Sequence, residues 1–71
     1  METTELNDSY FTSIGYDGAL RQLHVRFASG AYIIYSEVTQ MDYVGLLSSN
    51  QMKDFFHEKI EPRFPSRNVN T

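Results

Sequence analysis

Cysteine is absent from this 71-residue sequence. A chain without cysteine forms neither a disulfide nor a thiolate metal site, and its indifference to redox conditions fits the cytosol. Long apolar runs are missing too, because the longest, AYIIY, is far shorter than the roughly 20 residues that a membrane-spanning helix needs. No apolar stretch follows the polar N-terminus, so no signal peptide is predicted. We therefore expect a soluble, cytoplasmic protein with no membrane partner.

Positive charge is also scarce. Nine Asp and Glu residues outnumber six Lys and Arg residues, which gives a net charge of −3 at pH 7. Domains that bind nucleic acid neutralise phosphates with Lys and Arg and are usually basic. The composition therefore disfavours RNA as a partner, although one local patch could still contact it. Aromatic residues, by contrast, are plentiful, and five Phe and five Tyr can build a dense core.

The length limits the chain to one small domain, which buries only about 60% of its unfolded surface. Residues 1–8 and 65–71 are polar and without periodicity, so we expect flexible tails at both ends. The single domain is predicted to cover residues 9–64.

Alternating apolar residues predict three β-strands in the first half of the chain. These strands cover residues 9–17, 23–27 and 31–38. The third stretch is rich in β-branched and aromatic residues, which fit a pleated surface. Asp17-Gly18 and the segment 28–30 supply short turns. Because short turns join antiparallel neighbours, the three strands are expected to form a meander.

Beyond Thr39 the apolar spacing becomes helical. Thr39 and Asp42 resemble a capping box, in which the hydroxyl accepts a backbone N–H. Two apolar helix faces follow: Met41, Val44 and Leu47, and then Met52, Phe55, Phe56 and Ile60. The polar segment 48–51 leaves open whether this is one broken helix or two. The predicted fold class is α+β, a three-stranded antiparallel β-meander followed by two short C-terminal helices packed on one face.

Candidate catalytic and metal-binding groups are few. His24 and His57, the only histidines, fall in different elements, and a zinc site without cysteine would need both of them plus carboxylates. No serine stands in a G-x-S-x-G motif, and Asp54 with Glu58 fits a solvated helix face. We therefore expect no catalysis, no metal and no cofactor.

One face of the predicted sheet is left open, because the helices cover the other. Alternation places His24, Arg26, Tyr32 and Ile34 on that open face, with Phe11 on the same side. Tyr and Arg are enriched at binding hot spots, so these five residues form the candidate contact surface. The alternative is that this face is exposed to solvent and binds nothing, or that other parts of the chain cover it.

An ordered set of motifs runs through the same elements. It consists of Ile14-Gly15-Tyr16-Asp17, Leu23-His24-Val25-Arg26-Phe27, Gly30, Ile33-Ile34-Tyr35-Ser36-Glu37-Val38, and then Tyr43, Leu46, Leu47, Phe55, Phe56, Ile60 and Phe64. Over residues 9–64 this order resembles the KTSC domain family. Thr39 departs from the family's usual proline, and Gln51-Met52-Lys53 departs from its S-x-G, which should lengthen the second helix.

The resemblance implies a family named after an appendage at the C-terminus of some lysyl-tRNA synthetases, with stand-alone copies in bacteria and phages. It supplies no catalytic residues. The function expected is a non-catalytic module that binds a protein partner, or a second copy of itself, through the open sheet face. One alternative is an RNA- or tRNA-binding accessory domain, and another is a phage-derived inhibitor of a host protein.

Overall fold

The computed structural model describes residues 2–6 and 8–69. Within them the elements follow in the order β1 (Glu2–Glu5), β2 (Phe11–Asp17), β3 (Gln22–Phe27), β4 (Tyr32–Tyr35), α1 (Gln40–Ser48), α2 (Met52–Phe55), the π-helix η1 (Phe56–Ile60) and β5 (Ser66–Asn68). The strands form an antiparallel sheet in which spatial order equals sequence order. The predicted α+β class is confirmed, and the predicted meander forms β2, β3 and β4.

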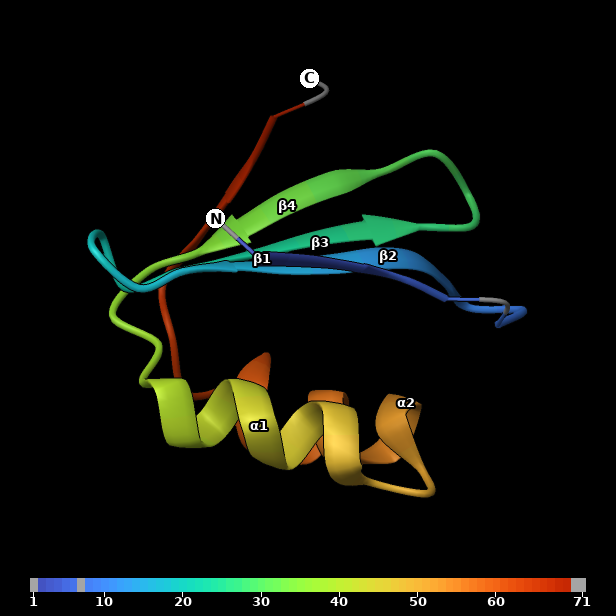
Figure 1. Cartoon of the computed structure of the whole chain (residues 1–71). Coiled ribbons are helices and arrows are strands. Elements are labelled where there is room, and N and C mark those ends of the chain that lie inside the picture. The colour runs from blue at the N-terminus through green and yellow to red at the C-terminus, as the bar shows by residue number, and fades with distance from the viewer. Residues whose placement is uncertain (1, 7, 70–71) are drawn as a thin grey trace.

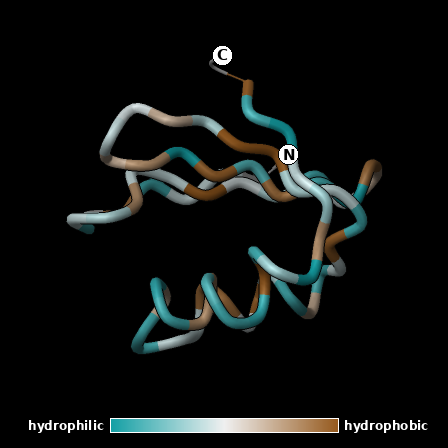
Figure 2. The backbone as a smooth tube through the Cα atoms, turned by 180° about the vertical axis from the view of Figure 1, so that it is seen from behind, coloured by the Kyte–Doolittle hydropathy of each residue, from teal (hydrophilic) through white to brown (hydrophobic). Residues whose placement is uncertain are grey.

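The sheet is one layer, and the helical segments form a second layer on one side of it (Figure 1). Figure 2 shows hydrophobic stretches along the strands and a mixture of hydrophilic and hydrophobic residues in the helical layer. None of the helices in the described part of the chain is long and apolar enough to span a membrane.

Both segments that were predicted to be flexible tails contain edge strands, so the prediction of three strands was incomplete. β1 pairs with β2 at one edge of the sheet, and β5 pairs with β4 at the other. An edge strand pairs through its backbone and needs no apolar alternation, and every residue of β5 is exposed. Met1, Asn7, Asn70 and Thr71 also fell in or beside the predicted tails, but they lie outside the described residues.

A β-bulge at the start of β2 changes which side chains face the helices. Phe11 lies opposite Phe27, and Ser13 lies opposite Arg26, so Thr12 is the extra residue. The bulge turns Phe11 toward the helical layer, where it is fully buried. Its predicted place on the open face is therefore wrong, because unbroken alternation does not hold across a bulge.

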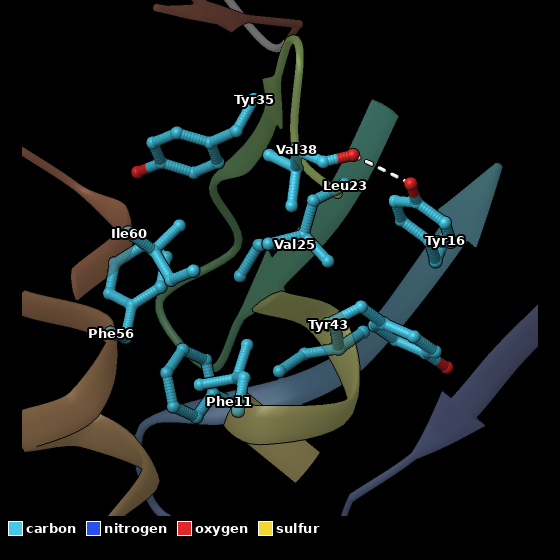
Figure 3. Packing of buried hydrophobic residues seen from close by; sticks show 11 residues of the cluster. Phe11, Tyr16, Leu23, Val25, Tyr35, Val38, Tyr43, Phe56 and Ile60 are labelled. Carbon is cyan, nitrogen blue, oxygen red and sulfur yellow. Dashed lines mark hydrogen bonds between the residues drawn. The ribbon is translucent and has the colours of Figure 1, made fainter. Parts of the chain in front are cut away.

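Aromatic and aliphatic side chains share the core between the two layers (Figure 3). Phe56 of η1 lies edge-on to Phe11, with ring centres 5.5 Å apart, and edge-on to Tyr35 at 5.3 Å. At the other end of the core, Tyr16 stacks on Tyr43 at 5.1 Å and its hydroxyl donates a 2.6 Å hydrogen bond to the Val38 carbonyl. The sheet and the helical layer are thus joined by ring contacts and by one buried polar contact.

The predicted cap of α1 is confirmed. The backbone N–H of Asp42 donates to the Thr39 hydroxyl at 3.2 Å, and that hydroxyl donates to the Asp42 carboxylate at 2.7 Å. The face that packs, however, carries Tyr43 and Leu46, whereas Met41 is 84% exposed and Val44 is 50% exposed. The apolar face marked by Met41 and Val44 in the sequence is therefore turned mostly to solvent.

The helical layer breaks after Ser49, so α1 and α2 are separate helices. α2 has only four residues and runs directly into η1, whose wider turn is closed when the Glu61 N–H donates to the Phe56 carbonyl at 2.8 Å. Phe56 and Ile60 stand four residues apart on the same side of this segment, and both are fully buried in the core. The longer α-helix expected around Met52 is not formed.

Candidate functional site

The outer face of the sheet, which points away from the helical layer, is the candidate functional site. Residues opposite one another in an antiparallel sheet share a face, so the strand register defines its members. They are Thr3, Glu5, Ser13, Gly15, Asp17, Gln22, His24, Arg26, Tyr32, Ile34 and Arg67. Glycine, small polar and charged side chains make up most of this face, in contrast to the ring-filled inner face.

Three of the predicted contact residues meet in one cluster at the centre of this face. Nδ1 of His24 is hydrogen-bonded to the Tyr32 hydroxyl at 2.6 Å. The Arg26 guanidinium carbon lies 4.4 Å from the centre of the Tyr32 ring, which is a cation–π contact. Arg26 is exposed, and His24 and Tyr32 are half-buried. The His24–Tyr32–Arg26 cluster is thus a fixed cationic and aromatic surface that solvent can reach.

The electrostatics of the cluster keep His24 uncharged. Partial burial lowers the pKa of His24, and the charges of Arg26 and Arg67 lower it further, while Asp17 acts in the opposite direction. A neutral imidazole can accept the Tyr32 hydroxyl hydrogen at Nδ1. At pH 7 the positive charge of the cluster therefore belongs to Arg26.

A shallow depression lies beside the cluster at the β3–β4 turn. It encloses about 250 Å³, and its lining includes Thr12, Arg26, Gly30 and Tyr32. The extra residue of the bulge, Thr12, is exposed at this rim. The bulge therefore contributes a wall to the depression as well as turning Phe11 inward.

Two of the five predicted contact residues are buried. Phe11 packs in the core, as described above. Ile34 does face outward, between His24 and Arg67 in the register, but it is only 7% exposed. The added strand β5 covers the edge of β4 and places Arg67 beside Ile34, so Ile34 lies on the outer face but exposes little area to a partner.

The sequence interpretation missed Arg67 and Val69, which it assigned to a tail. The Val69 N–H donates to the Tyr32 carbonyl at 2.8 Å, and the Val69 side chain is 44% exposed. The only signal for a strand there was the short alternation of Arg67 and Val69 with polar neighbours.

A second exposed apolar surface, also unexpected, lies on α1. Gln40, Met41, Val44 and Gly45 line an open, mainly apolar depression of about 380 Å³. Its only charged neighbour in the helix, Asp42, is paired with Arg63 at 3.8 Å. This surface competes with the outer sheet face as a contact site.

Metal ligands do not gather in the described part of the chain, where no group of three His, Cys, Asp or Glu residues is close enough to hold an ion. The two histidines lie in different layers. His24 is on the outer face of the sheet, whereas His57 lies in η1 with Nδ1 3.4 Å from a Glu61 carboxylate oxygen.

Comparison with known proteins gives the family. The model of the KTSC domain matches residues 7–64. A crystal structure of a KTSC domain protein from Yersinia pestis superposes with a TM-score of 0.87 at 26% sequence identity, and the match covers 96% of each chain. A search of curated proteins found no significant match. The matched residues span the central strands and the whole helical layer, and the chain belongs to the KTSC domain family.

Proposed function

We propose that this chain is a non-catalytic interaction module that binds a protein partner, or a second copy of itself, through the outer face of its sheet. The His24–Tyr32–Arg26 cluster carries the proposal. An exposed arginine lies over a tyrosine ring whose hydroxyl is already fixed by a histidine. Side chains held in place before binding lose less conformational entropy, and Tyr and Arg dominate binding hot spots.

The mixture of charges on this face favours a protein over RNA. Glu5 lies across Ser13 from Arg26 in the register, and Asp17 is close enough to act on His24. A phosphate backbone that lay along the sheet would meet these carboxylates as well as the arginines. A protein surface with charges of both signs would meet complementary groups.

An RNA-binding accessory domain is the second candidate, and one observation favours it. Arg26 and Arg67 both stand on the outer face near His24, with the Tyr32 ring between β3 and β5. Two arginines beside an aromatic ring can hold phosphates and stack a base. A phage-derived inhibitor of a host protein would be a special case of the protein-binding proposal.

Affinity capture from a lysate of the source organism, with and without nuclease, tests both candidates. The bait is compared with Arg26→Glu and Tyr32→Ala, and with Met41→Ser as a matched change on the α1 surface. We expect a protein that survives nuclease, is lost with both outer-face variants and is kept with Met41→Ser. Loss on nuclease treatment would favour RNA, and loss with Met41→Ser alone would place the contact on α1.

Self-association requires a separate measurement by sedimentation velocity across a range of concentrations. If a second copy is the partner, the wild type dimerises with rising concentration, and Arg26→Glu stays monomeric. Phosphate contacts weaken steeply with salt, whereas a partly apolar protein contact changes little, so ionic strength gives a further distinction between the candidates. A wild-type monomer at all concentrations would exclude the homodimer.

A further inference from the structure

A pocket of about 320 Å³ opens where the β3–β4 turn meets the end of η1. It is separate from the outer face, because Phe27 and Ile33 line it with the side chains that point toward the helical layer. Tyr10, just before β2, and Glu61, just after η1, close its other sides. The volume lies at the lower end of the roughly 300–1,000 Å³ that is typical of ligand pockets.

The lining combines aromatic walls with one carboxylate. The rings of Tyr10 and Phe27 meet edge to face with centres 5.3 Å apart, and Ile33 adds an aliphatic surface. Among the described residues that line the pocket, Glu61 alone carries a carboxylate. Its one recorded partner is His57, at the long distance of 3.4 Å, and its side chain is 52% exposed. The carboxylate is therefore available to a ligand.

The neighbouring phenols remain neutral and add no charge of their own to the pocket. Burial and the Glu61 carboxylate raise the pKa of Tyr10. Burial, then Glu61, then Tyr10 raise the pKa of Tyr35 to about 12, and this ring stands two residues beyond Ile33 on the same face of β4. Glu61 and Tyr10 both line the pocket, so charge and aromatic surface act on the same small volume.

We propose that this pocket binds an ammonium group carried on a short aliphatic stem. Glu61 pairs with the ammonium, the Tyr10 ring contributes a cation–π contact, and Phe27 and Ile33 contact the stem. Nζ of Lys53 lies 5.0 Å from the centre of the Tyr10 ring, so a bound ammonium shares this ring with Lys53 or displaces it. Glu61 repels an anion, and one carboxylate alone is too few ligands for a divalent metal.

Titration of the ¹⁵N-labelled chain with n-butylammonium, followed by NMR, tests the proposal. 1-Butanol has the same butyl stem without the charge, and pentanoate has the same butyl stem with the opposite charge. We expect saturable shifts at Ala28, Ser29 and Ala31 with a dissociation constant on the order of 1 mM for the cation, and at least about tenfold weaker binding of both controls. An Nα-acetyl-lysine amide in a parallel titration shows whether a lysine side chain is preferred to a free amine.

Two variants separate the carboxylate from the ring. Glu61→Gln should weaken the binding of butylammonium about tenfold or more. Glu58→Gln changes an exposed residue of η1 outside the lining and should leave the affinity for butylammonium unchanged. Tyr10→Leu keeps an apolar wall in the pocket. This variant should bind butylammonium more weakly and butanol with the same affinity as the wild type. Equal binding of butanol and butylammonium, unchanged binding in Glu61→Gln, or no saturable shift would overturn the proposal.

Discussion

The two faces of the sheet use the same strands and the same residue types in opposite ways. On the inner face Tyr16, Tyr35 and Phe11 are buried, and their rings contact other rings. On the outer face Tyr32 is half-buried, and its ring and hydroxyl contact a cation and an imidazole. Aromatic residues therefore stabilise the fold on one side and present a chemically specific surface on the other. The difference depends on which face the helical layer covers.

The two faces should differ most in the free energy of unfolding that is lost when a side chain is truncated. Phe56→Ala empties the centre of the inner face and is expected to lower the free energy of unfolding by about 3–5 kcal/mol. Because domains of this size are only marginally stable, the variant should be partly unfolded at 25 °C. Urea denaturation followed by circular dichroism measures the change.

Val69→Ala is the control, at an exposed position that follows β5 and whose N–H pairs with the carbonyl of the outer-face residue Tyr32. The Val69 side chain is 44% exposed, so the expected change is below about 0.5 kcal/mol. A loss in Val69→Ala comparable to that in Phe56→Ala would mean that the outer face is part of a second core.

A smaller and sharper contrast comes from two tyrosine hydroxyls. Tyr16→Phe leaves the buried Val38 carbonyl without its 2.6 Å donor and should cost about 1–2 kcal/mol of stability. Tyr32→Phe removes a hydrogen bond that water can replace, and a loss below about 0.5 kcal/mol is expected. Equal losses in the two variants, again in urea, would contradict the assigned difference in solvation.

The smallest effect concerns His24 and pH. Its pKa in the folded chain lies below the ordinary value of 6.5, so the folded state takes up the proton less readily than the unfolded state. The resulting stability is present above about pH 6.5 and is lost as the pH falls from there toward the folded pKa. Asp8, whose pKa is also lowered, titrates below its ordinary 3.8 and lies outside this window.

Wild type and His24→Gln, unfolded in urea between pH 7.5 and 5.5, test this prediction. As the pH is lowered from 7.5 to 5.5, the free energy of unfolding should decrease more in the wild type than in His24→Gln. NMR titration of the imidazole in the intact fold should give a midpoint below 6.5. A midpoint above that value would show that Asp17 outweighs burial and the two arginines.

The sequence contained enough signal for the central strands, the cap of α1 and three members of the outer cluster. Strict alternation around His24 and Arg26 placed both correctly, and Thr39 with Asp42 gave the helix start. It did not contain the bulge at Thr12, because one extra residue in a weakly alternating strand leaves no local mark. Phe11 was misplaced for that reason.

The edge strands and the packed side of α1 escaped prediction for other reasons. β1 and β5 are set by backbone pairing with a sheet that only the folded chain provides. α1 is apolar on more than one side, and the spacing of Met41 and Val44 indicated one side as the core face, whereas Tyr43 and Leu46 on another side are buried. Only the position of the helix against β2 decided between them. The pocket at Glu61 is lined by residues that lie far apart in the sequence, from Tyr10 to the β3–β4 turn and Glu61, so it could not be predicted from local spacing.

The two outermost strands have a practical consequence for the design of expression fragments. The segment that matches the family model, residues 7–64, excludes both β1 and β5. A protein cut to those limits would leave rows of unpaired N–H and C=O groups along β2 and β4, which recruit strands from neighbouring molecules. Such a fragment is expected to aggregate under conditions in which the full chain does not. The terminal strands β1 and β5 therefore protect the edges of the sheet.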